Sequence, residues 1–133
     1  MNDNYFLDSN ILIYSKGNEP LKKETSLGLL KDNFYISTQV VNEFINARVK
    51  KFNDDKANAF KLANDILELC NLVIIDKETF KSCEVIFIKY GYSFYDSMII
   101  SAALKSECAI LYSEDLSHNQ IIEKKLKIVN PFK

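Results

Sequence analysis

Four carboxylate residues stand beside apolar runs, at points where a strand or a helix is expected to begin or end: Asp8, Glu43, Asp96 and Asp115. Acidic side chains usually lie on solvated faces, and burying such a charge without a partner is costly. Mg²⁺ and Mn²⁺ prefer oxygen ligands and would be a sufficient partner for three or four converging carboxylates. The pattern is therefore typical of a metal-dependent nuclease.

Hydrolysis of a phosphodiester requires an activated water, stabilisation of charge on the phosphate, and help for the leaving oxygen. One or two divalent ions held by acidic side chains can supply all three, and a more distant carboxylate can orient or deprotonate the water. No histidine is needed. This suits a chain with one histidine, His118, which we interpret as a surface or capping residue, and in which no Ser-His-Asp set can be assembled.

Small polar residues accompany the four acids. Asn10 follows the first of them and Ser113 precedes the last, and both are candidates to orient a carboxylate or a water. Ser9 and Ser97 could also orient a carboxylate or a water, but capping of the helix that follows explains these two residues at least as well. Glu114 adjoins Asp115, and we expect it to be exposed to solvent.

The elements that must position these residues alternate between strands and helices. Strands are predicted by short runs of β-branched or aromatic residues at positions 5–7, 34–36, 72–75, 109–112 and 128–129. Longer stretches with helical spacing separate them. This alternation predicts an α/β fold with a parallel sheet covered by helices on both faces.

Two of the acids are expected on helices and two behind strands. Apolar spacing predicts a helix over 38–52 with Thr38 as its N-cap and Glu43 in its first two turns. A second helix is predicted within 54–69, and two more flank Gly91, with Asp96 in the first turn of the latter. Ligands of open parallel sheets bind beyond the carboxyl ends of the strands. Two strand ends and two helices can therefore converge.

The composition is that of one soluble globular domain, which we assign to residues 1–133. The chain is 47% hydrophobic, and its 17 basic and 18 acidic residues give a net charge of −1. This argues against binding nucleic acid through overall charge, although a local basic patch stays possible.

The first residues lack the basic and apolar regions of a signal peptide, so the expected location is the cytoplasm. The three cysteines show no metal-binding spacing and are expected to be reduced and buried.

Four sequence blocks resemble the PIN-domain ribonucleases, and within them the VapC-like toxins of bacterial toxin–antitoxin pairs. The blocks are FLDSNIL (6–12), ISTQVVNEF (36–44), SFYDSMI (93–99) with Ala102 and Ala103, and ILYSEDL (110–116). Each resembles the family's segment around one of its acids. The order and spacing of the blocks agree with the family over nearly the whole chain.

The resemblance implies a three-layer α/β/α sandwich with a central parallel sheet, RNA cleavage that depends on Mg²⁺ or Mn²⁺, and a role as a growth-inhibiting toxin. Asp8, Asp96 and Asp115 would face the metal, Glu43 would complete the site, and Ser113 would support the last acid. One departure is visible in the fourth block. Relatives often place glycine after the histidine, whereas Asn119 follows His118 here. Asparagine tolerates left-handed backbone better than most residues.

Three other classes of protein are alternatives for this pattern of acids. A haloacid-dehalogenase-type hydrolase would require a second acid where Asn10 stands. A receiver-like domain could use Asp76 as its acceptor, but it leaves Glu43 and Asp96 unexplained. An inactive PIN-like module that binds RNA or protein is the main alternative. Retention of four mutually repelling carboxylates argues against it.

Basic residues that could contact RNA are Arg48, Lys50 and Lys51 at the end of the Glu43 helix, and Lys124, Lys125 and Lys127 near the C-terminus. Such contacts would position a strand without reading its sequence. Solvated helix ends, with cations that offset the helix dipole, explain them equally well. The family resemblance further implies a small antitoxin that covers the acids, and a homodimer formed through the apolar faces of the helices that carry Glu43 and begin near Asp54.

Overall fold

The computed structural model describes residues 2–31 and 33–133, so Met1 and Asp32 lie outside the described residues. Strands and helices alternate along the chain, as the sequence pattern predicts. The strands are β1 (Tyr5–Leu7), β2 (Tyr35–Ser37), β3 (Asn71–Val73), β4 (Ile110–Tyr112), β5 (Ile121–Ile122) and β6 (Leu126–Val129). The helices are α1 (Ser9–Ser15), α2 (Pro20–Leu29), α3 (Thr38–Lys50), α4 (Lys56–Leu69), α5 (Lys77–Tyr90) and α6 (Phe94–Lys105).

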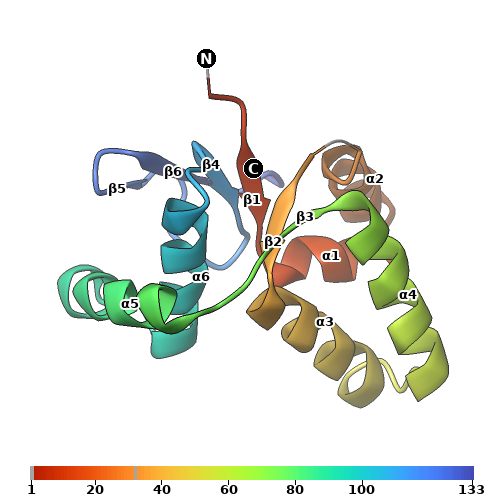
Figure 1. The fold of residues 1–133 in the computed structure, drawn as a ribbon. Coiled ribbons are helices and arrows are strands. Elements are labelled where there is room, and N and C mark those ends of the chain that lie inside the picture. The colour runs from red at the N-terminus through yellow and green to blue at the C-terminus, as the bar shows by residue number, and fades with distance from the viewer. Residues whose placement is uncertain (1, 32) are drawn as a thin grey trace.

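The described strands form one sheet in the order β3-β2-β1-β4-β6-β5, with α5 and α6 on one face and α1 to α4 on the other (Figure 1). The expected α/β fold with three layers is therefore present. β1, β2, β3, β4 and β6 run parallel. The chain moves from β1 outward to β2 and β3, and later returns to place β4 on the other side of β1. The carboxyl ends of β1 and β4 thus flank a point where strand order reverses, which is where ligands of such sheets bind.

One strand departs from the expected all-parallel sheet. β5 pairs antiparallel with β6 through a tight turn in which Glu123 and Lys124 have φ values of 50° and 59°. These two left-handed residues lie at the centre of a turn closed by the Lys125 N–H, which donates to the Ile122 carbonyl at 3.0 Å, and their conformation suits the twist of antiparallel strands. The strand was not predicted because a two-residue apolar pair has no period to detect. It adds an edge to the sheet and leaves the arrangement around Asp8 unchanged.

Helix α6 forms the centre of the core. Its residues from Ser97 to Ala103 are buried without interruption, and α5 packs along it. A helix that is apolar on nearly all sides must be covered on all sides. Its first turn emerges from this packing at Phe94, Tyr95 and Asp96. The core thereby holds the helix end that carries Asp96.

The predicted cap of helix α3 differs from the structure. Helix α3 is capped by Ser37, whose hydroxyl accepts a hydrogen bond from the Val40 N–H at 3.3 Å. Thr38 is instead the first helical residue, and its hydroxyl accepts from the Ile75 N–H at 3.3 Å. The prediction of Thr38 as the cap was wrong because two adjacent hydroxyl residues can both cap, and only the end of β2 decides between them.

Candidate active site

Asp8 lies directly after β1 and is almost fully buried, with 5% of its surface exposed. Its N–H donates to the Tyr112 carbonyl at 3.0 Å, which extends the pairing of β1 with β4 by one residue. Its side chain caps α1, since Oδ1 accepts from the Ser9 N–H at 2.7 Å. The cap of α1 is thus Asp8 and not a serine.

Ser113 connects Asp8 to the Asp115 loop. Its buried hydroxyl donates to Asp8 Oδ2 at 2.8 Å and accepts from the Asp115 N–H at 3.2 Å. Asn10 makes a second connection, because its amide nitrogen donates to Asp115 Oδ2 at 3.1 Å and its oxygen accepts from the Glu114 N–H at 3.3 Å. The two residues singled out as supports for the acids therefore join the loops after β1 and β4.

Glu43 is half-buried in the second turn of α3. The Gln39 amide nitrogen, one turn earlier, donates to Glu43 Oε2 at 3.2 Å and to the backbone carbonyl of Tyr95 at 3.0 Å. Gln39 therefore holds the Glu43 carboxylate against the start of α6. Gln39 was not predicted as a support, although its spacing of four from Glu43 indicates that the two side chains share a helix face.

Asp96 lies in the first turn of α6, as predicted, and is partly buried. Ser93 caps this helix by accepting from the Asp96 N–H at 3.1 Å. The positive end of the helix dipole favours a carboxylate at this position. Ser97 is not a cap: it lies inside the helix, and within the described residues its buried hydroxyl has no hydrogen-bond partner.

Burial raises the pKa of Asp8 to about 7, while the hydrogen bonds from Ser113 and the Ser9 N–H lower it and the negative charges of Glu43 and Asp96 raise it further. The charges of three of the four candidate acids therefore act on one another. Asp115, which is exposed, is tied to the same place through Asn10 and Ser113. Such mutual repulsion is the situation in which a cation would be favoured.

The donor chemistry of this set fits Mg²⁺ or Mn²⁺, with a limit on the number of direct protein ligands. Among the described residues, no three His, Cys, Asp or Glu side chains stand close enough to hold a metal ion by themselves. Mg²⁺ typically uses one or two carboxylates and completes its shell with waters and substrate phosphates. Asp8 with one neighbouring acid would satisfy that requirement.

We expect Ser113→Ala to lower any metal-dependent activity by about 10- to 100-fold, as loss of a residue that orients a ligand does. The variant leaves Asp8 Oδ2 and the Asp115 N–H without their shared hydroxyl. We expect a loss of about 1–3 kcal/mol in the free energy of unfolding, measured by urea titration. Ser106→Ala, which removes a hydroxyl far from the acids, is the control. Unchanged activity in Ser113→Ala would show that the hydroxyl does not position the carboxylates.

Glu114 is partly buried and not freely exposed as expected. It accepts hydrogen bonds from the Tyr14 hydroxyl at 2.5 Å and from Lys22 Nζ at 2.6 Å. Lys22 also lies 4.6 Å from the centre of the Tyr14 ring. The side chain therefore points away from Asp115 and fastens the loop to α1 and α2. The sequence could not show this, because Lys22 is 92 residues away.

The basic residues proposed for RNA contact differ in availability. The Arg48 guanidinium is paired with Asp54 at 3.1 Å and donates to the Lys16 carbonyl at 3.3 Å, so it is used inside the protein. Lys50 and Lys51 are exposed. His118 is exposed and accepts from the Asn130 N–H at 2.9 Å, which is the surface and capping role expected of it. Asn119 adopts the left-handed conformation, with φ at 70°.

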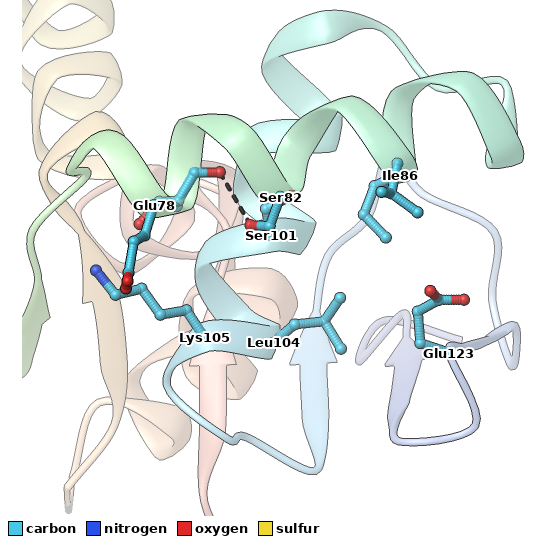
Figure 2. Close-up of a pocket in the computed structure, with 9 residues that line it drawn as sticks. Glu78, Ser82, Ile86, Ser101, Leu104, Lys105 and Glu123 are labelled. Atoms are coloured by element: carbon cyan, nitrogen blue, oxygen red, sulfur yellow. Dashed lines mark hydrogen bonds between the residues drawn. The ribbon is translucent and has the colours of Figure 1, made fainter.

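A cavity of about 400 Å³ between α5 and α6 is separate from the acids. Figure 2 shows Ile86 of α5 and Leu104 of α6 bordering this space, with Glu123 at one end. None of the four candidate acids lines it. Its Lys105 forms an ion pair with Asp76 at 2.5 Å, and Asp76 also caps α5. These contacts explain Asp76 structurally and remove the support for a receiver-like phosphorylation site.

The cysteines are free thiols, as predicted: Cys83 and Cys108 are buried and Cys70 partly so. Among the described residues, no helix is both long and apolar enough to cross a membrane.

Solved structures with the same fold cover nearly the whole chain. A toxin–antitoxin complex from Klebsiella pneumoniae has a chain with 18% identity and a TM-score of 0.71, over 96% of this chain and 97% of that one. VapC20 of Mycobacterium tuberculosis, described as a toxin that cleaves the sarcin–ricin loop, has 14% identity and a TM-score of 0.69, over 84% and 89%. VapBC-1 from nontypeable Haemophilus influenzae has 19% identity and a TM-score of 0.65, over 98% and 99%. No curated protein sequence matches the chain.

The model of the PIN domain matches residues 5–124, which include all four candidate acids. The segment extends from the first residue of β1 through the turn between β5 and β6. This chain therefore belongs to the PIN domain family.

Proposed function

We propose that this protein is a metal-dependent endoribonuclease that acts as the toxin of a toxin–antitoxin pair. The observation that carries the proposal is the state of Asp8, a buried carboxylate at the strand-order reversal whose ionisation is opposed by burial and by Glu43 and Asp96. Capping of α1 alone does not require a charge at this position, because a neutral capping residue such as Asn or Ser would be cheaper to bury. Membership of the PIN domain family supports the same reading.

In this proposal Mg²⁺ or Mn²⁺ binds among Asp8, Glu43, Asp96 and Asp115, with Asp8 and one neighbouring acid as direct ligands and the other acids acting through bound waters. The ion would supply an activated water and stabilise charge on the phosphate. Ser113 and the Ser9 N–H stabilise the ionised form of Asp8. Asn10 holds the Asp115 carboxylate in place. Gln39 fixes Glu43, which is positioned to accept a proton from the attacking water. Each support has a distinct carboxylate to orient.

The experiment that tests this function is cleavage of total cellular RNA by the purified chain, free of antitoxin. We expect discrete fragments with Mn²⁺ or Mg²⁺ and none with EDTA, because the carboxylates alone supply neither the activated water nor the positive charge. Circular dichroism in each buffer would verify that the protein stays folded. Equal cleavage with and without EDTA would overturn the metal dependence. The absence of cleavage by folded protein with either ion would favour the alternative, an inactive RNA- or protein-binding module.

We further propose that a small antitoxin covers the acids. Support comes from the fold neighbour from Klebsiella pneumoniae, which was solved as a toxin–antitoxin complex. Co-expression with the product of the adjacent reading frame tests this: binding and relief of toxicity are expected, and the failure of both would refute it.

A homodimer through α3 and α4 is a separate proposal. Phe60 of α4 and Phe52 in the segment between the two helices are exposed, at 58% and 43%. A single monomer mass by light scattering at micromolar concentration would refute it.

A further inference from the structure

A second cavity of about 510 Å³ adjoins the candidate active site. Its wall consists of Gln39, Asn42, Glu43 and Asn46 of α3, with Tyr95 of α6 on the other side. Glu43 belongs to both the cavity and the candidate set of acids, and Tyr95 immediately precedes Asp96. A molecule in this cavity would therefore be next to the phosphodiester that the acids are proposed to cleave.

The α3 wall presents a row of amides. Gln39, Asn42 and Asn46 are spaced by three and four residues, so they share one face of the helix. Asparagine is a poor helix former, at a cost of roughly 0.6 kcal/mol relative to alanine at each site. Asn42 and Asn46 are exposed in the interior of the helix. An amide offers both a donor and an acceptor, which is the pattern that reads the edges of nucleobases.

The remaining lining residue, Tyr95, presents an exposed aromatic ring that is packed against other rings. Tyr95 is 65% exposed, although its ring lies 5.5 Å from that of Phe94 in an edge arrangement. Phe94 is contacted in turn by Phe80 and Phe87, at 6.1 and 6.0 Å. Gln39 holds the Tyr95 backbone carbonyl. Tyr95 thus displays an aromatic surface whose neighbours restrict its motion, and such surfaces stack well on bases.

The charge of the cavity selects which part of a nucleotide it accepts. The carboxylate of Glu43 is part of the wall, and no Lys or Arg lines the cavity. The cavity therefore offers a phosphate no basic side chain to pair with, whereas its amides and aromatic ring suit a neutral base. A base can enter such a cavity only when it is unstacked, which is the usual condition for sequence recognition in RNA.

We propose that this cavity is a nucleobase subsite, in which the Tyr95 ring stacks on an unpaired base and the amides of Asn42 and Asn46 contact its edge. Gln39 is a positioning residue, because its amide nitrogen already holds Glu43 and Tyr95. The inference rests on the proposed ribonuclease function and identifies the residues that would hold an unpaired base next to the cleaved bond.

The test is RNA binding by the full chain in the Asp96→Asn background, which separates binding from cleavage. The probe is a fluorescent random-sequence RNA strand of about 12 nucleotides, a length within the range of known single-strand sites, followed by anisotropy in Mg²⁺ buffer. We expect Tyr95→Ala to weaken binding by about five- to 100-fold, the effect of losing one stacked base. Tyr95→Phe keeps the ring and is expected to bind like its parent.

Leu21→Ala is the control, since Leu21 is an apolar side chain of α2 that is 80% exposed and does not line this cavity. The same RNA annealed into a duplex is expected to show no dependence on Tyr95, because its bases are not available for stacking. Equal weakening by Leu21→Ala, or unchanged affinity in Tyr95→Ala, would overturn the subsite. Unchanged RNA affinity with weaker antitoxin binding would reassign Tyr95 to a protein contact.

The failures of the two proposals are distinguishable. If the wild-type chain does not cut RNA but binding depends on Tyr95, the subsite stands and the nuclease does not. If the wild-type chain cuts and Tyr95→Ala binds normally, only the subsite is rejected.

Discussion

Asp96→Asn is expected to reduce RNA cleavage by at least about 100-fold, since it removes a proposed metal-facing carboxylate whereas loss of a supporting residue alone costs 10- to 100-fold. The amide has nearly the same size, and Ser93 continues to cap α6 through the residue's backbone N–H. The packed part of the helix begins only at Ser97. We therefore expect the circular dichroism spectrum and the unfolding midpoint to stay close to those of the wild type.

The matched control for this variant is Asp65→Asn, an identical change on the exposed surface of α4, where the carboxylate lies 3.8 Å from Lys61. It should cleave like the wild type because surface ion pairs of this kind contribute little. Both proteins would be compared on the same RNA by the rate of fragment appearance on a denaturing gel. A wild-type rate from Asp96→Asn would reject the role of this residue.

Asp8→Asn is expected to abolish cleavage and, at the same time, to stabilise the protein in the absence of divalent cations near pH 8. Burial raises the pKa of Asp8 from 3.8 to about 7. Between these values the folded state retains a proton that the unfolded state releases, so the stability of the wild type falls as the pH rises toward 7 and then levels off. That difference corresponds to roughly 4 kcal/mol, as an upper estimate.

Asparagine does not ionise, so the free energy of unfolding of the variant does not include this loss at higher pH. Its side-chain oxygen can still cap α1 through the Ser9 N–H, and the Ser113 hydroxyl can rotate to serve as an acceptor. Urea titrations in EDTA, compared near pH 5 and pH 8, measure the effect as a difference in the free energy of unfolding. The wild type should lose stability over this interval, and the variant should lose less.

Added Mg²⁺ provides the complementary result. A cation that binds only the folded wild type raises its stability, whereas the Asp8→Asn variant should respond weakly or not at all. A variant that is no more stable than the wild type at pH 8 in EDTA would show that Asp8 is not an unfavourable buried charge. A variant that cleaves RNA at the wild-type rate would reject the metal-facing role.

The sequence by itself determined the α/β class, most strand positions within one or two residues, and the elements that carry the acids. These inferences succeeded because they depend on local periodicity and on runs such as residues 5–7 and 109–112, which contain the whole of β1 and β4. It also singled out Asn10 and Ser113, because both lie within two residues of an acid.

Only the tertiary structure decided which side chains meet across the molecule. Gln39 holds Glu43 and also contacts Tyr95, which lies 56 residues farther along the chain. Lys22 contacts Glu114, which lies 92 residues away. It also showed that Arg48 is used in an internal ion pair and that Tyr95 and the α3 amides share a cavity. The physical reason is that hydrophobic patterning specifies which face of an element is buried, whereas side-chain partners depend on how separate elements pack. Sequence spacing therefore indicates Asn10, Ser113 and Gln39 as supports, because each lies within four residues of an acid, whereas packing decides that Asn10 holds Asp115 and that Ser113 holds Asp8.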